Sequence, residues 1–124
     1  MTVDVATTRA FLEKRAARRR ERLRALAADA QADCDRIVHM LVADFDPRRI
    51  YQWGSLLTPE RFREWSDIDL ALEGLTDPLA GLRALDAACG LTRFPVDLVE
   101  LERIHPLHAE TIRQTGKLIY EKLQ

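Results

Sequence analysis

The sequence predicts an α/β (α+β) fold in which helices flank a small mixed sheet of three to four strands. A helical apolar pattern fills most of residues 1–46, and short β-prone segments then alternate with helical ones. Such alternation is typical of a sheet with helices packed on it. The chain has 124 residues and no repeat or low-complexity linker, so we expect one domain. Its N-terminal helical segment is residues 1–46 and its core residues 48–121.

The first expected element is a long helix that ends at Asp46-Pro47, because a proline disfavours helical backbone in the residue before it. Thr7 or Thr8 can cap its N-terminus. A helix of nearly 40 residues is long for so small a domain, so a break near Arg20 is an alternative. The apolar residues that recur at steps of three and four are Leu23, Leu26, Ala27, Ala30, Cys34, Ile37, Val38, Leu41, Val42 and Phe45.

The charge of the chain is unevenly distributed. Residues 1–24 carry eight basic and three acidic side chains, whereas the remainder carries eleven basic and seventeen acidic ones. We interpret the basic stretch first as a solvated helix face. Because six arginines lie between Arg15 and Arg24, contact with RNA or with an acidic partner remains an alternative.

The next segments predict two strands joined by a short helix. The β-prone run Arg49–Trp53 stops at Gly54-Ser55. Residues 58–65 are expected to form a helical turn or short helix that begins at Thr58-Pro59. Residues 67–73 alternate between polar and apolar side chains, which predicts a half-buried strand.

The C-terminal part continues the alternation. Asp77 is expected to cap a helix that begins at Pro78 and ends at Gly90. A third strand is expected over residues 94–101, with Val96 and Leu98 on one side and with Asp97, Val99 and Leu101 on the other. The last helix begins at Pro106 and ends at Gly116, and Leu118-Ile119-Tyr120 can add a short edge strand.

Cysteine usage and hydropathy bear on location. Cys34 and Cys89 lack the spacing of a metal or redox motif, so we expect both to be buried small apolar residues in a reduced cytosol. No apolar run approaches the roughly 18 residues of a membrane span. A cytoplasmic location is therefore expected.

Three features have the chemistry of a phosphoryl-transfer site. Gly54 lets the backbone approach a phosphate, and Ser55 can donate its hydroxyl to phosphate oxygens. Asp67 and Asp69 lie two residues apart on one strand, so they share a side at a separation of about 7 Å. Oxygen ligands of this kind suit Mg²⁺. Asp97 stands alone in an apolar strand, where burial without a partner is costly.

Each feature also has a plain structural explanation, as a turn, the polar side of a strand or a surface carboxylate. Their combination is rarer and makes mechanistic sense, because two metal ions about 4 Å apart clamp both oxygens of an in-line displacement. We therefore predict that Asp67 and Asp69 hold a triphosphate-bound metal. Asp97 is predicted to complete a second metal site and to help activate the acceptor hydroxyl.

The chain resembles the minimal nucleotidyltransferases of the DNA polymerase β superfamily over residues 48–121. The matching motifs are Trp53-Gly54-Ser55, Ser66-Asp67-Ile68-Asp69-Leu70, Pro95-Val96-Asp97-Leu98-Val99 and the ending Gly116-Lys117-Leu118-Ile119-Tyr120. The resemblance implies a nucleotidyltransferase fold with a catalytic core over these residues. It also implies that Gly54 and Ser55 contact phosphates and that Asp67, Asp69 and Asp97 are catalytic metal ligands.

The same resemblance implies an activity and a partner. The enzyme would use Mg²⁺ and a nucleotide triphosphate, most simply ATP, to place AMP on an acceptor hydroxyl. Such domains often accompany a small helical HEPN toxin as its antitoxin, so a HEPN protein is the expected partner. Two alternatives remain: a non-catalytic binding module that neutralises a partner by contact, and a small-molecule transferase of the aminoglycoside type.

The loop between the motifs departs from the family pattern. Eleven residues separate Ser55 from Asp67 rather than ten, and they are bulkier than usual. Arg61 and Arg63 can reach phosphates or form a solvated helix face, and we favour the second. Among the remaining residues, His39 is expected to be packed or at the boundary of the core, Trp53 to pack, and His105 and His108 to serve in capping or at the surface.

Overall fold

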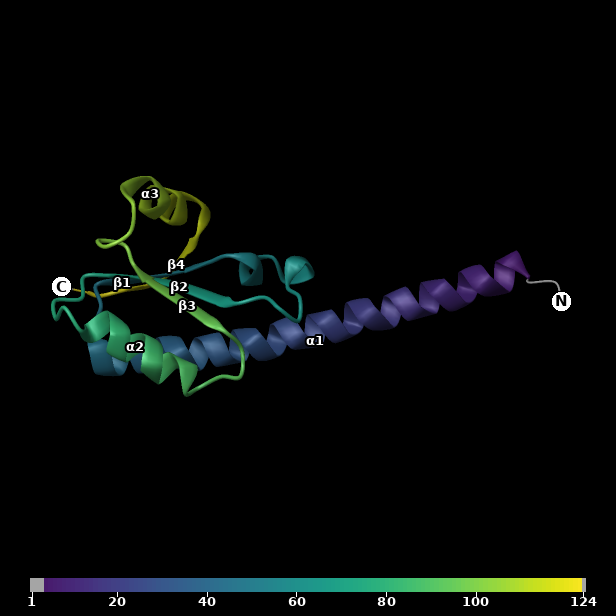
Figure 1. Ribbon diagram of the computed structural model, residues 1–124, viewed down its shortest axis with the longest axis horizontal. Coiled ribbons are helices and arrows are strands. Elements are labelled where there is room, and N and C mark those ends of the chain that lie inside the picture. Colours follow the sequence, from purple (N-terminus) through teal and green to yellow (C-terminus); the bar gives the residue numbers. More distant parts are fainter. Residues whose placement is uncertain (1–3, 124) are drawn as a thin grey trace.

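The structure is a computed structural model that describes residues 4–123 (Figure 1). Its four strands are β1 (Arg49–Trp53), β2 (Ile68–Glu73), β3 (Val96–Glu100) and β4 (Lys117–Glu121). They form one sheet in the order β3-β2-β1-β4. β1 runs antiparallel to β2 and β4, whereas β2 and β3 are parallel. The expected mixed sheet is confirmed, as is β4 at its edge.

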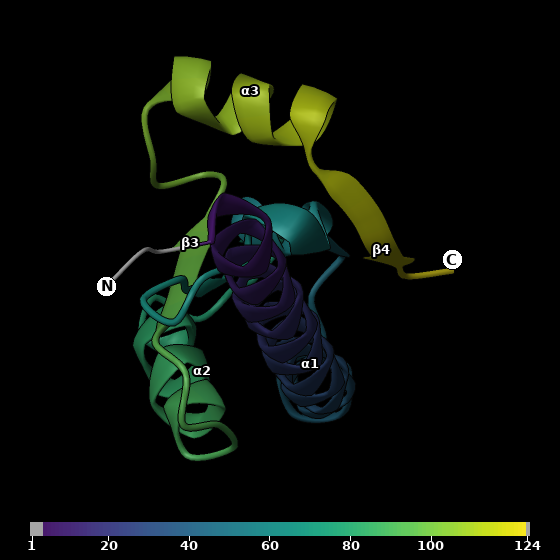
Figure 2. The same cartoon turned by 90° about the vertical axis from the view of Figure 1, so that its right-hand side faces the viewer.

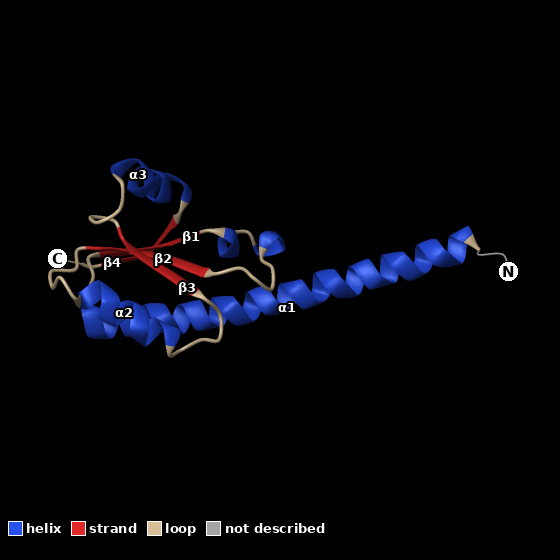
Figure 3. Ribbon diagram, in the orientation of Figure 1, coloured by secondary structure: helices blue, strands red, loops and turns tan. Residues whose placement is uncertain are grey.

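Three α-helices cover the sheet. They are α1 (Val5–Phe45), α2 (Ala80–Cys89) and α3 (Pro106–Thr115). Figures 2 and 3 show α1 and α2 side by side under one face, with α3 over the other. The N-terminus of α2 differs from expectation, because the helix begins at Ala80 rather than at Pro78. Asp77 nevertheless accepts a hydrogen bond from the backbone N–H of Leu79, at 2.9 Å.

The N-terminus of α1 also differs from expectation, because Asp4 caps the helix rather than Thr7 or Thr8. Asp4 Oδ1 accepts from the backbone N–H of Ala6, and its Oδ2 accepts from the Thr7 hydroxyl at 2.7 Å. The helix passes Arg20 without a break. It ends at Phe45, where Asp46 takes a left-handed φ of 51° before Pro47, so the predicted end is confirmed.

Only the C-terminal half of α1 packs on the sheet. Every residue from 5 to 22 is exposed, and Figure 1 shows this part projecting beyond the end of the sheet. We call residues 5–22 the arm. Burial begins with Ala27 and continues through Leu41.

Two clusters of apolar side chains fill the space on either side of the sheet. Ile68, Leu70 and Leu72 of β2 point into the larger cluster, which lies against α1 and α2. The smaller cluster lies between the sheet and α3 and contains Tyr51, Ala71, Leu101, Ala109 and Ile112.

The expectation that β2 is half-buried is wrong, because the strand is buried along its whole length. α3 and its cluster cover the face that alternation alone would leave to solvent. Glu73 is buried on this face and accepts hydrogen bonds from Arg49 of β1 and, at 3.3 Å, from Arg113 of α3. The buried charge is therefore paired and joins the helix to the sheet.

The loop after β1 forms two short 3₁₀ turns, Ser55–Leu57 and Pro59–Arg61. The second is the helical turn expected to begin at Thr58-Pro59, but it ends at Arg61 rather than continuing to residue 65. Of the two cysteines, Cys34 is buried, and burial raises the pKa of its thiol to about 12. Cys89 is exposed at the end of α2, so its predicted burial is wrong. None of the helices within residues 4–123 combines the length and apolarity needed to cross a membrane.

Candidate active site

The strand register brings the three aspartates of the sequence motifs together. In the parallel pair β2–β3, Asp69 and Asp97 are direct partners. Asp67 lies two residues before Asp69, and therefore on the same face of the strand path. All three belong to the face that α3 covers further along. The result is an acidic group at the end of the sheet where β2 and β3 begin (Figure 1).

Asp69 is the most buried of the three, with only 8% of its surface exposed. Burial raises the pKa of its carboxyl to about 7, and the charges of Asp97 and Asp67 add to the shift. No hydrogen bond or ion pair to a residue in the range 4–123 offsets these carboxylates. Unpaired carboxylates in buried or partly buried positions form an environment that a bound cation would stabilise.

Gly54 lies against the same carboxylate. Antiparallel pairing sets Trp53 opposite Asp69, so the chain turns beside the acidic group as it leaves β1. Gly54 has a φ of 80°, and a Cβ on it would stand 2.7 Å from Asp69 Cγ. Only glycine meets both requirements, the left-handed φ and the close approach.

Ser55 begins the first 3₁₀ turn directly after Gly54. The turn is closed by hydrogen bonds from Leu57 N–H to the Gly54 carbonyl, at 3.2 Å, and from Thr58 N–H to the Ser55 carbonyl, at 3.0 Å. Ser55 therefore enters the turn one residue after the glycine that lies against Asp69.

The donor set fits magnesium by its chemistry. All three side chains offer carboxylate oxygen, the ligand type that Mg²⁺ prefers. Across residues 4–123, no three His, Cys, Asp or Glu side chains converge into a ready-made metal cage. Mg²⁺ commonly takes only one or two carboxylates and completes its shell with water and substrate phosphates, so an open acidic face is compatible with it.

The arginines of the loop have different surroundings. The Arg63 guanidinium donates to the backbone carbonyls of Glu60, at 2.7 Å, and Phe62, at 2.9 Å, which fastens it to its own loop. Arg61 is exposed. His39 is exposed too, whereas His105 accepts from the Leu107 N–H at 3.1 Å and so caps α3 as expected.

One contact beside the site has no counterpart in the sequence analysis. His108 of α3 meets Trp53 edge to face, with ring centroids 5.6 Å apart. Within residues 4–123, the buried Trp53 indole N–H has no hydrogen-bond partner. Because Trp53 is the cross-strand partner of Asp69, the pair lies beside the acidic group. No local signal links these two residues, since the contact depends on where α3 crosses the sheet.

This fold, with paired acidic strands and a Gly-Ser turn, defines a nucleotidyltransferase. The family model described as "Polymerase beta, Nucleotidyltransferase" matches residues 35–124, well over half of the chain. The protein belongs to this family. A comparison with curated proteins found no match. The arm lies outside the matched residues.

Solved structures of toxin–antitoxin complexes share the fold. A crystal structure of the toxin-antitoxin MntA-HepT is 21% identical, with a TM-score of 0.57, covering 74% of this chain and 73% of that chain. A toxin-antitoxin with AMP-PNP is 24% identical, with a TM-score of 0.58 and coverages of 72% and 74%. A third match is a tri-AMPylated Shewanella oneidensis HEPN toxin in complex with MNT antitoxin. It is 21% identical, with a TM-score of 0.57, and the match covers 75% of this chain and 73% of that chain.

Proposed function

We propose that the protein transfers AMP from ATP to a hydroxyl group on a partner protein, with Mg²⁺ as the metal. The observation that supports this most directly is the register of β2 and β3, which pairs Asp69 with Asp97 next to Asp67 and the Gly54 turn. Carboxylates in this arrangement are suited to phosphoryl chemistry, because they gather the cations that neutralise a triphosphate.

Each residue has a distinct task in this proposal. Asp67 and Asp69 would hold the metal that binds the triphosphate, and Gly54 and Ser55 would bring backbone and hydroxyl donors to its phosphate oxygens. Asp97 orients the acceptor hydroxyl and takes its proton. The acceptor oxygen bonds to the α-phosphorus as the bond to the bridging oxygen breaks, and pyrophosphate leaves. When bound, Mg²⁺ supplies positive charge to the attacking and leaving oxygens.

We further propose that the acceptor is a HEPN-type toxin and that this chain is its antitoxin. The similar solved structures include an MNT antitoxin bound to a HEPN toxin that carries three AMP groups, and a toxin–antitoxin with an ATP analogue. Another similar complex is a variant with two aspartates, two positions apart, replaced by glutamate. That spacing equals the spacing of Asp67 and Asp69.

The rival proposal is a module that neutralises its partner by contact alone. It draws on the open arrangement of the carboxylates, which form no compact cage within residues 4–123. A small-molecule transferase finds less support, because the similar solved structures are toxin–antitoxin complexes.

A binding titration followed by a transfer assay tests the proposal. ATP is titrated into the wild-type chain, into Asp67→Asn/Asp69→Asn and into the control Asp86→Asn, an exposed position on α2, each with and without Mg²⁺. Labelled ATP is then supplied together with the HEPN protein of the same genome. Magnesium-dependent binding and transfer that only the double variant loses support the enzyme. Neutralisation that survives in the double variant supports the contact-only module.

A further inference from the structure

The arm continues the stripe that α1 buries elsewhere. In the packed half, the residues that face the sheet are Ala27, Ala30, Cys34, Ile37 and Leu41. At 100° per residue, the same face of the arm carries Val5, Leu12 and Ala16. Val5 is 77% exposed and Leu12 53% exposed. A stripe that is buried at one end of the helix therefore lies open at the other.

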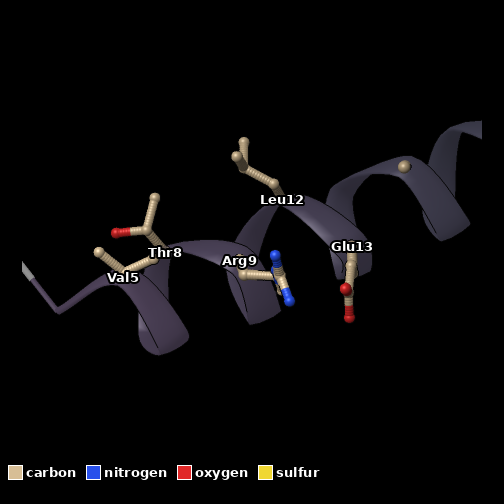
Figure 4. Close-up of a pocket in the computed structure, with 6 residues that line it drawn as sticks. Val5, Thr8, Arg9, Leu12 and Glu13 are labelled. Atoms are coloured by element: carbon tan, nitrogen blue, oxygen red, sulfur yellow. The ribbon is translucent and has the colours of Figure 1, made fainter.

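Figure 4 shows this part of the arm. Thr8 and Leu12 point to one side of the helix and Glu13 to the other, with Val5 and Arg9 between them. Together with Arg9 and Ala16, these residues line a shallow hollow that is open to solvent and lies apart from the carboxylates. An apolar strip bordered by charge, and not covered by any described part of the chain, is suited to an apolar groove in another protein.

The charge of the arm indicates what borders that groove. The arm carries seven basic and two acidic side chains. By helical position, Arg9 and Arg20 lie along one edge of the stripe and Arg15 and Arg19 along the other. Arg19 also reaches Glu64 at 3.3 Å. Two arms laid together would bring these cations against one another, so a groove rimmed with carboxylates is the complementary surface.

The arm also leaves the rest of the molecule near the end of the sheet that carries the acidic group. Figure 1 shows it extending from the end of the sheet where β1 finishes and where β2 and β3 begin, which is the end that carries the acidic group. Because α1 is unbroken, the stripe in the arm faces the side of the helix on which the sheet lies. A protein seated on the stripe would lie beyond the end of the sheet at which Asp67, Asp69 and Asp97 gather, and would reach them past that end because they lie on the opposite face from α1.

We infer that the arm is the docking site for the acceptor protein, which it receives in an apolar groove with an acidic rim. This inference rests on the proposed function, because it takes the docked protein to be the one that presents the hydroxyl. Nucleic acid would bind the arginines through its phosphates but would not cover the apolar stripe.

Two double variants of equal charge test the docking site. Leu12→Glu/Ala16→Glu puts carboxylates on the stripe, and Ala10→Glu/Ala17→Glu puts them on another exposed face of the same turns. Binding of the HEPN protein is measured by calorimetry, and transfer is measured across a range of HEPN concentrations. We expect the stripe variant to raise Kd and the acceptor KM at least tenfold while the affinity for Mg²⁺-ATP and the rate at saturation stay unchanged. The control should remain near wild type.

Several results would overturn the inference. They are equal losses in the two variants, unchanged acceptor binding in both, a wild-type homodimer that only the stripe variant dissociates, and tighter binding of a single-stranded RNA probe than of the HEPN protein. Stripe-dependent binding without transfer would leave the docking site standing and count against the proposed function. Magnesium-dependent ATP binding without any HEPN complex would do the reverse.

Discussion

At the scale of single residues, the site is defined by the contact between Gly54 and Asp69. The glycine has a left-handed φ, and the space its side chain would occupy is filled by the carboxylate. Asp69 in turn is crowded by Asp67 and Asp97 without a compensating partner in residues 4–123. Close packing and uncompensated charge thus meet at one point, and perturbed carboxylates of this kind are common where a fold serves chemistry.

Replacing Gly54 by alanine should damage both stability and binding. The new Cβ displaces the Asp69 carboxylate and forces alanine into a left-handed φ, so we expect a loss of about 1–3 kcal/mol in the free energy of unfolding. Mg²⁺-ATP affinity should fall as well. Urea unfolding and ATP titration measure the two effects. Gly90→Ala, at a φ of -74°, is the control and should be nearly neutral; equal behaviour of the two variants would contradict the argument.

Asp69 predicts a pH dependence for the metal-free protein. Its pKa rises from 3.8 to about 7 on folding, so between these values the folded state holds a proton that the unfolded state has released. Stability therefore decreases as the pH rises towards 7 and is level above it. We expect Asp69→Asn to unfold at a higher temperature than wild type, by a margin that grows from pH 5 to pH 7 and then stays constant.

Scanning calorimetry in the presence of a chelator measures this margin. Asp86→Asn on the exposed side of α2 serves as the control. A margin that does not change with pH would show that Asp69 keeps its ordinary acidity in the fold. With metal present the order should reverse, since only the wild-type carboxylate can bind the cation and gain stability from it.

At the scale of elements, local signals predicted the segments, but tertiary contacts decided their environments. Proline and glycine mark the ends of α3 at Pro106 and Gly116, and the sequence prediction agrees with the structure there. The alternation in β2 predicted which residues share a face, but it did not predict that α3 covers the polar face. The start of α1 was misplaced because Asp4 caps the helix with the Thr7 hydroxyl as its own partner.

The candidate site follows the same division. Spacing selected Asp67 and Asp69 from the sequence, and a lone carboxylate in an apolar strand selected Asp97. Their proximity depends on the parallel register of β2 and β3, which no local pattern encodes. The contact between Trp53 and His108 requires the position of α3 over the sheet, so it was found only in the structure.

Glu73 supports a prediction at this scale, because it ties α3 and β1 to β2. Glu73→Gln removes the charge that Arg49 and Arg113 share. Since both arginines are more than a third exposed and can turn to water, we expect a modest loss of about 1–2 kcal/mol in unfolding free energy. Hydrogen exchange should quicken in α3 more than in α1. Uniform quickening would contradict a local role.

At the scale of the whole molecule, a basic arm extends from an otherwise acidic chain. Residues 1–24 carry five more basic than acidic side chains, and the rest carries six more acidic than basic ones. An acidic acceptor would therefore be attracted to the arm and repelled by the body until cations occupy the site. Opposite fields at the two ends of one molecule would orient a partner before contact.

The salt dependence of complex formation tests this picture. We expect the association rate with the HEPN protein to fall steeply once the salt concentration exceeds about 0.1 M, where charges about 10 Å apart become screened. Arg9→Gln/Arg20→Gln, beside the stripe, should slow association and flatten the salt dependence. Lys14→Gln/Arg18→Gln removes the same charge from the opposite face. If both pairs act alike, net charge alone guides the partner.

Because α1 is one continuous helix, the arm is joined to a helical segment that the sheet already holds in place. Forming the first turn of a helix is the unfavourable step, with a nucleation constant of roughly 10⁻³, and the packed half of α1 already supplies that turn. The arm can then unfold only turn by turn from Val5 towards the packed half. A partner that binds its N-terminal turns reduces this fraying. Better capping at Asp4 would accordingly tighten the complex without any new contact across the interface.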